Sequence, residues 1–256
     1  MLFMGQVNFR KITTNKERHI MNNIKTMLVA LIAIFALSTS SFAGSIGVGI
    51  AGHQIGISAD GTETPGGTET GTENSVKSAT AGNQAFVGSY FLEYNFGDSE
   101  RFTLGVDVIP GSAKINNKTL TRVDGASGDS NDTAGTKGAQ ATIENHNSYY
   151  AEFVVGKGIY LKAAMVQLDV KTQDTTTGTG TFGAYGDTSI DGTTYAIGQK
   201  GLIGSNGFYK IEGYTTDYDK INLTQSGAST TGTSTNSSLT ANLDVVGAAF
   251  RVGLKF

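Results

Sequence analysis

The last eleven residues of the chain, 246–256, alternate between apolar side chains and polar or small ones. Successive side chains of a β-strand point to opposite faces, so this alternation predicts a strand with one apolar face. The apolar face carries Phe250, Val252, Leu254 and Phe256. The opposite face is basic or small and includes Arg251 and Lys255.

Other stretches of the chain repeat this alternation, and in several of them one charged residue interrupts the less apolar face. The pattern is least regular after His53 and around Lys162, which falls on the apolar side unless a β-bulge shifts the phase. The predicted strands cover about eight stretches, at 46–57, 84–96, 101–110, 147–156, 159–171, 194–203, 207–218 and 243–256.

The connections between these strands alternate in length. Tight, glycine-containing turns are predicted at GDSE 97–100, GKG 156–158 and GSNG 204–207. The other connections are long and rich in Thr, Gly, Ser and Asn, at 58–83, 111–146, 172–193 and 219–242. Short turns on one rim and long loops on the other predict an all-β fold, a single antiparallel eight-stranded transmembrane β-barrel with short periplasmic turns and long extracellular loops.

A secreted β-sandwich adhesin is the alternative fold, because its strands alternate in the same way. A sandwich gives no reason for the strict alternation of short and long connections. Composition agrees with many strands joined by polar loops, since the chain has 35 Gly and only 2 Pro. A net charge of -3 does not indicate nucleic-acid binding, and the absence of Cys excludes disulfides.

The N-terminal segment predicts export. The apolar run MLVALIAIFAL at 27–37 follows Lys25, and Ala43 precedes Gly44. A basic start, a short apolar run and small residues at the cleavage position are typical of a signal peptide, and the run is shorter than the roughly 20 residues of a membrane helix. We therefore expect residues 1–43 to be an upstream extension plus a cleavable signal peptide, the signal proper at 21–43, and residues 44–256 to form the barrel.

The charged residues on the less apolar faces are expected to meet inside the barrel. Eight strands leave an interior just wide enough for side chains, and buried charges need partners. The network can be a salt-bridge plug that closes the lumen or a narrow conduction path whose pairs rearrange. Its predicted members are Glu93, Asp107, Glu152, Asp169, Lys200, Lys210, Glu212, Arg251 and Lys255.

No motif predicts catalysis. GVGIAG at 47–52 fits G-x-G-x-x-G, but it lacks the preceding strand and following helix of a nucleotide site. His53 and His146, with Ser58, Ser148 and Asp107, allow one to imagine a hydrolase site, which no nucleophile motif supports. We therefore expect no enzymatic activity and no catalytic, cofactor or metal site.

The signal peptide, the strand pattern and the terminal FRVGLKF together resemble the eight-stranded outer-membrane proteins of Gram-negative bacteria, the group of the OmpA transmembrane domain, OmpX and the opacity proteins. Many members carry Tyr where this chain has Leu254. In that family the assembly machinery reads the terminal strand, which implies this role for Phe250, Val252, Leu254 and Phe256.

The resemblance implies an integral outer-membrane protein, a monomer, whose barrel is a structural scaffold. Its loops would contact lipopolysaccharide, surface partners or phage, and its assembly partners would be the barrel-assembly machinery and periplasmic chaperones. The alternative function is a small porin-like channel with a polar lumen. An outer-membrane hydrolase is the third possible function.

Overall fold

The computed structural model describes residues 44–64, 76–115, 120–124, 135–178, 184–226 and 237–256, and in these residues the chain forms strands and turns. The signal-peptide prediction, which concerns residues 1–43, lies outside them. Nowhere in the described ranges is there a helix that is long and apolar enough to span a membrane.

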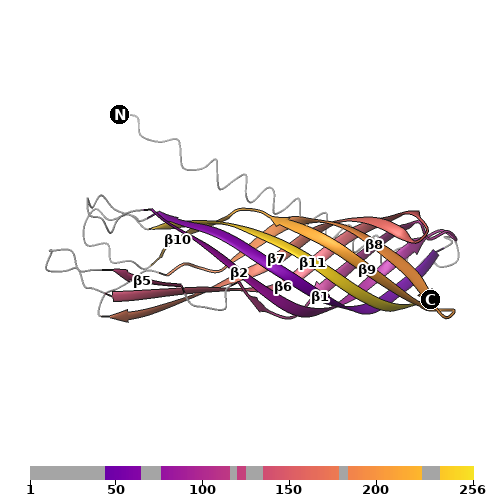
Figure 1. Ribbon diagram of the computed structural model, residues 1–256, viewed down its shortest axis with the longest axis horizontal. Helices are drawn as coiled ribbons and strands as arrows, with labels where there is room; N and C mark the ends of the chain where they lie inside the picture. Colours follow the sequence, from indigo (N-terminus) through magenta and orange to yellow (C-terminus); the bar gives the residue numbers. More distant parts are fainter. Residues whose placement is uncertain (1–43, 65–75, 116–119, 125–134, 179–183, 227–236) are drawn as a thin grey trace, which may run out of the picture.

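Eight strands close into one antiparallel barrel in the described part of the chain (Figure 1). Each strand pairs with the next, and β1 pairs with β11 from Gly47 opposite Lys255 to Thr64 opposite Ser238. The predicted fold is confirmed. The barrel strands are β1 (Gly44–Thr64), β2 (Lys77–Phe96), β3 (Phe102–Ile109), β6 (Gly135–Gly156), β7 (Ile159–Gly178), β8 (Thr188–Ile203), β9 (Gly207–Tyr218) and β11 (Ser238–Lys255).

The three predicted tight turns join β2 to β3, β6 to β7 and β8 to β9. Gly97 and Gly204 adopt φ values of 69° and 65° in two of these turns, a conformation that glycine reaches without strain. The C-terminus lies at the same end of the barrel (Figure 1). There the Phe256 amide donates to the Ile46 carbonyl at 2.9 Å, and the Ile46 amide donates back at 3.0 Å, which completes the closure.

Most strands continue further toward the loop end than the alternation predicts. Segments 58–64, 77–83 and 135–146 were expected in loops and instead extend β1, β2 and β6. Their Gly- and Thr-rich sequences resemble loops, but the ladder with a neighbouring strand satisfies their backbone groups. Three short strands add to this end, β4 (Ala113–Lys114) and β5 (Leu120–Asp124) on β6, and β10 (Ile221–Thr224) on β11.

The two faces of the sheet exchange character partway along the barrel. On β11, near the turns, Phe250 and Val246 are exposed on the outside and Arg251 is buried inside. Closer to the loops, Val245 is buried inside and Asp244 is exposed. The turn half is therefore apolar outside and polar inside, as in a membrane barrel, and the loop half has the opposite polarity.

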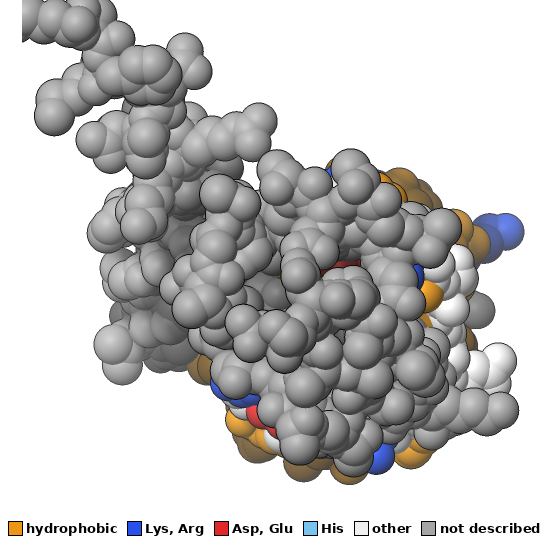
Figure 2. Space-filling view, turned by 90° about the vertical axis from the view of Figure 1, so that its left-hand side faces the viewer, with side chains coloured by type: hydrophobic (Ala, Val, Ile, Leu, Met, Phe, Trp, Pro, Cys, Tyr) orange, Lys and Arg blue, Asp and Glu red, His pale blue; other side chains and the backbone are white. Residues whose placement is uncertain are grey.

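The apolar outer surface forms a belt around the turn half, and hydrophobic side chains show along the flank of the barrel when it is viewed from the loop end (Figure 2). A membrane-crossing strand needs about 9–11 residues, whereas β1 has 21. The barrel therefore extends beyond the bilayer on the loop side. Belt residues include Val48, Ile50, Phe86, Tyr90, Leu92, Phe153, Leu161, Tyr195, Ile197, Ile211, Val246, Phe250 and Leu254.

Several glycines lie directly opposite an aromatic residue on the neighbouring strand. Gly105 pairs with Tyr150, and Gly198 pairs with Tyr160. A Cβ added at either glycine would overlap the tyrosine ring. The missing side chain thus gives each ring room to lie flat against the barrel wall, inside a narrow lumen.

Replacing Gly105 by Ala is therefore expected to displace Tyr150 and lower the free energy of unfolding by about 1–3 kcal/mol, the usual range for overpacking. Urea unfolding of the protein in phospholipid vesicles would measure it. Gly213→Ala is the matched control, since an added Cβ there meets no atom within 4 Å. An equal loss in both variants would contradict the proposed reason.

Candidate functional site

A first ion cluster occupies the lumen near the turns. Lys210 Nζ lies 2.6 Å from Oε2 of Glu93 and 2.6 Å from Oε2 of Glu152. The Tyr150 hydroxyl donates to the same Glu93 oxygen at 2.8 Å. Each of the three charged side chains is 1% exposed. Pairing therefore has to offset the cost of removing these charges from water.

A second ion cluster lies next to the first and centres on Glu212. Its Oε1 accepts from Lys162 Nζ at 2.6 Å and from Arg251 Nε and Nη2 at 3.1 and 3.0 Å, and its Oε2 accepts from the Tyr160 hydroxyl at 2.8 Å. Arg251 Nη1 lies 2.5 Å from Asp107 Oδ2. Two cations and two carboxylates make this cluster electrically balanced.

Two buried tyrosines join the clusters into one network. Tyr150, which donates to Glu93, has Lys162 Nζ 5.0 Å from its ring centroid. Tyr160, which donates to Glu212, has Lys210 Nζ 5.7 Å from its ring centroid. Both cations lie within the range of cation–π attraction. The network thus contains six of the nine predicted lumen residues and one residue that was not predicted, Lys162. The six are Glu93, Asp107, Glu152, Lys210, Glu212 and Arg251.

Lys200 and Lys255, also predicted in the network, lie instead at the turn end of the lumen with Glu100. Lys255 Nζ lies 3.1 Å from Glu100 Oε1, Lys200 Nζ donates to the Glu100 carbonyl at 2.8 Å, and the Ser45 hydroxyl donates to Oε1 at 2.8 Å. Burial raises the pKa of Glu100, but the hydrogen bonds from Ser45 and Lys255 outweigh it and hold that pKa below its usual value. Glu100 is thus ionised at neutral pH. Glu100 was not predicted as a lumen residue, because it belongs to a turn and the prediction used only charged residues within strands.

The prediction of Asp169 as a lumen residue is wrong. Asp169 lies on the outer face of β7, where it accepts hydrogen bonds from Ser189 at 2.5 Å and Asn145 at 2.9 Å. Lys162 and Leu168 are buried on the inner face instead. β7 pairs with β8 without a break, and the bulge falls on β6, between Glu144 and Asn147. On β7 the apolar side chains lie on the outer face near the turns and on the inner face near the loops. This follows from the opposite polarity of the two halves of the barrel.

His53 is not part of a Ser–His–Asp triad, although it lines one cavity with His146, Ser148 and Asp107. His53 Nε2 lies 2.9 Å from Ser89 Oγ, and Nδ1 lies 3.3 Å from the Tyr214 hydroxyl. A Ser–His–Asp triad needs a carboxylate at that second nitrogen. Ser58 is exposed on the outside of β1. In the part of the chain that the structure describes, no group of three His, Asp or Glu side chains could hold a metal.

The four residues of the predicted assembly signal lie on the outer face of the last strand or directly after it. Phe250, Leu254 and Phe256 are exposed there, and Val252 is partly exposed. An apolar row at the barrel seam is accessible to another protein before the strand enters lipid. Recognition of this row by the assembly machinery stays a prediction.

The closed barrel and its belt define the class of protein. In lipid every backbone N–H and C=O group needs a partner inside the protein, which only helices and closed barrels provide. Here closure between β1 and β11 removes the open edges, and the apolar belt faces outward. The chain is an integral membrane protein, a β-barrel of the outer-membrane type.

No protein-family model matches the sequence, and no curated protein matches it significantly. Among solved structures, it is similar to the outer membrane protein AlkL in lipid bilayers, with 14% identity over 84% of this chain and 91% of AlkL and a TM-score of 0.43. It is also similar to OprG from Pseudomonas aeruginosa (7% identity, 84% and 97% covered, TM-score 0.42). A third is the outer membrane protease OmpT from Escherichia coli (10% identity, 86% and 100% covered, TM-score 0.38). The class is therefore defined by the chain's own geometry.

Proposed function

We propose that the protein is a non-conducting barrel of the bacterial outer membrane that presents its long strand ends and loops at the cell surface. The barrel acts as the scaffold, and the surface contacts lipopolysaccharide, partner molecules or phage. The short turns and the C-terminus face the periplasm in this proposal. Short turns at one end and long connections at the other support this orientation, because outer-membrane barrels have short periplasmic turns and longer extracellular loops. The polar outer surface of the loop half fits a position in water beyond the bilayer.

The occupied lumen is the observation that carries the proposal. Seven charged side chains of the two clusters lie within the turn half, and none of them is more than 4% exposed. A porin-like channel needs a continuous aqueous path with accessible charges. Separating these pairs to open such a path would leave buried charges without partners, which is strongly unfavourable.

Single-channel recording tests the closed lumen. The refolded protein, its folded state checked by the heat-dependent gel shift of a barrel, is expected to give no discrete current steps in a planar lipid bilayer. A wide porin in the same bilayer serves as the positive control. Reproducible steps from the wild-type protein would contradict the proposal and favour the small channel.

A further inference from the structure

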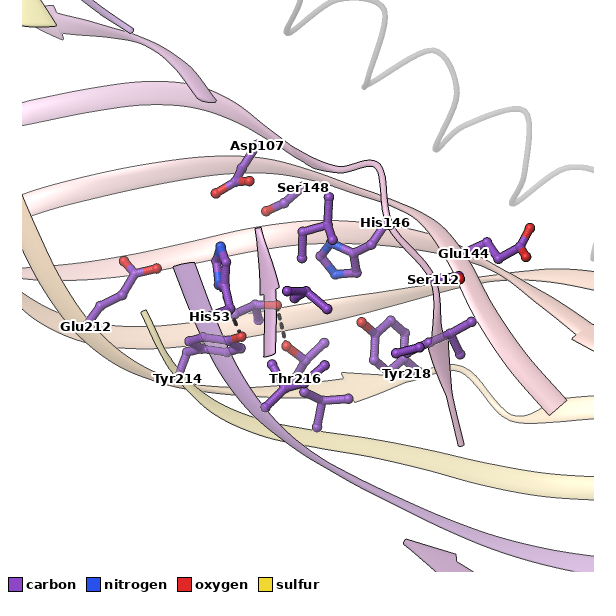
Figure 3. Close-up of a pocket in the computed structure, with 18 of the residues that line it drawn as sticks. His53, Asp107, Ser112, Glu144, His146, Ser148, Glu212, Tyr214, Thr216 and Tyr218 are labelled. Atoms are coloured by element: carbon purple, nitrogen blue, oxygen red, sulfur yellow. Dashed lines mark hydrogen bonds between the residues drawn. The ribbon is translucent and has the colours of Figure 1, made fainter. Parts of the chain in front are cut away.

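The lumen holds a cavity directly on the loop side of the second ion cluster (Figure 3). The floor of the cavity includes Arg251 and Asp107, and its walls include the apolar side chains of Ile55, Val87 and Val245. Its volume is about 60 Å³, counted as the space open to the centre of a water-sized sphere. One water needs about 10–15 Å³ on this measure, so the cavity has room for several waters or one small organic molecule.

The cavity lies where one strand of the barrel wall is short. β3 ends at Ile109, whereas its neighbours β2 and β6 continue toward the loops. Beyond that point β4 pairs with β6, and it is held to β2 by a hydrogen bond from Asn83 Nδ2 to the Lys114 carbonyl at 2.8 Å. Gly111 and Ser112, between β3 and β4, line the cavity and are exposed. The cavity therefore reaches solvent at the end of β3.

In the described part of the chain, four buried side-chain atoms of the cavity lining have no hydrogen-bond partner. Asp107 Oδ2 and Arg251 Nη1 form an ion pair with each other, whereas Asp107 Oδ1 and His146 Nδ1 have neither kind of partner. Asp107 is 3% exposed, and Figure 3 shows its carboxylate among the residues that line the cavity. The hydroxyls of Thr194 and Thr216, which also line the cavity, pair with each other at 2.7 Å. A buried acceptor without a donor is unfavourable, and a bound molecule can supply that donor.

We propose that this cavity is a binding site for a small, neutral, mainly apolar molecule that carries one N–H or O–H donor. The apolar walls favour an apolar body, and Asp107 Oδ1 accepts from the donor. The ligand is neutral because the charges at the floor already balance, Lys162 and Arg251 against Asp107 and Glu212. The site goes beyond the proposed function and does not depend on it, because its floor is the observed ion cluster.

Indole is a suitable probe because it is small, neutral and apolar, and it has one N–H donor. The chain has no Trp, so indole fluorescence can be excited where the protein's tyrosines absorb little. We expect saturable binding to the refolded protein, seen as increased fluorescence anisotropy, above the signal of protein-free detergent. N-methylindole, which has the same ring without the donor, is expected to bind at least tenfold more weakly, since loss of a donor leaves the buried acceptor unpaired.

Two neighbouring valines of β11 give a matched pair of variants. Val245 is 5% exposed and lines the cavity, whereas Val246 is 63% exposed on the outer belt. Val245→Phe should fill the cavity and abolish saturable indole binding, and Val246→Phe should leave it unchanged. Both variants must show the heat-dependent gel shift. His146→Phe, which removes the second unpaired atom, is the replacement if Val245→Phe does not fold, and it should weaken binding.

The absence of saturable indole binding to the wild-type protein would overturn the proposal. So would equal binding by the Val245→Phe and Val246→Phe variants, because the site would then lie elsewhere, or equal binding of indole and N-methylindole. These results are independent of the conductance test. A conducting barrel that still binds indole contradicts only the closed lumen, and a silent barrel that does not bind it contradicts only the ligand site.

Discussion

Lys210→Met is expected to lower the free energy of unfolding by about 3–5 kcal/mol, the range for breaking a buried ion pair by removing one partner. Lys210 is the shared partner of Glu93 and Glu152, and the two carboxylates would face each other in a site that excludes water. Methionine keeps the length and flexibility of the side chain, so the change tests the charge. Urea unfolding in phospholipid vesicles, followed by the heat-dependent gel shift, measures the loss.

Two further variants separate the buried pairing from a general effect of losing a lysine. Lys171→Met removes an ion pair with Asp187 whose side chains are 40% and 50% exposed, and stability should not change measurably. Lys210→Met combined with Glu93→Gln and Glu152→Gln removes the uncompensated charges and should recover much of the loss. If Lys210→Met alone is as stable as wild type, the first cluster contributes nothing to closing the lumen.

Arg251→Met is expected to have a loss of similar size, about 3–5 kcal/mol. Glu212 keeps its hydrogen bonds from Lys162 and Tyr160, whereas Asp107 loses the guanidinium that lies against it. The unpaired Asp107 carboxylate therefore accounts for most of the expected loss. The same unfolding measurement applies, with Arg101→Met as the control, because Arg101 is exposed at the turn end and should be dispensable.

A double-mutant cycle tests this assignment to Asp107. Asp107→Asn in the Arg251→Met background removes the unpaired charge, so the double variant should be more stable than Arg251→Met alone. Losses that simply add would show that the two side chains do not depend on each other. The second cluster would then have to be explained by Glu212 alone.

Strand number and closure could be predicted because they depend on patterns that are local in the sequence. The apolar row of 250–256 and the glycine-containing turns at 97–100 and 204–207 are each visible within a few residues. Six of the network charges could be predicted in the same way, because each one interrupts an otherwise regular strand. These charges were predicted to lie in the lumen because a membrane barrel is apolar on its outer face.

That rule failed where the barrel leaves the membrane. Val166 and Leu168 look like lipid-facing residues in the sequence, and this interpretation put Asp169 inside. In the structure both apolar side chains are in the lumen, because the outer surface of the loop half faces water and its interior needs an apolar core. The sequence alternates in the same way on both sides of this boundary, so the change of solvent is not visible in it.

By itself the sequence determined the class of fold, the order of the strands and the apolar seam that ends in Phe256, because side-chain alternation and turn chemistry are local properties. Only the tertiary structure decided which charges pair, that Lys210 serves two carboxylates, and that the short β3 leaves a cavity beside Asp107. These features join strands that are far apart in the chain. They depend on barrel closure, register and strand length together, which no single segment specifies.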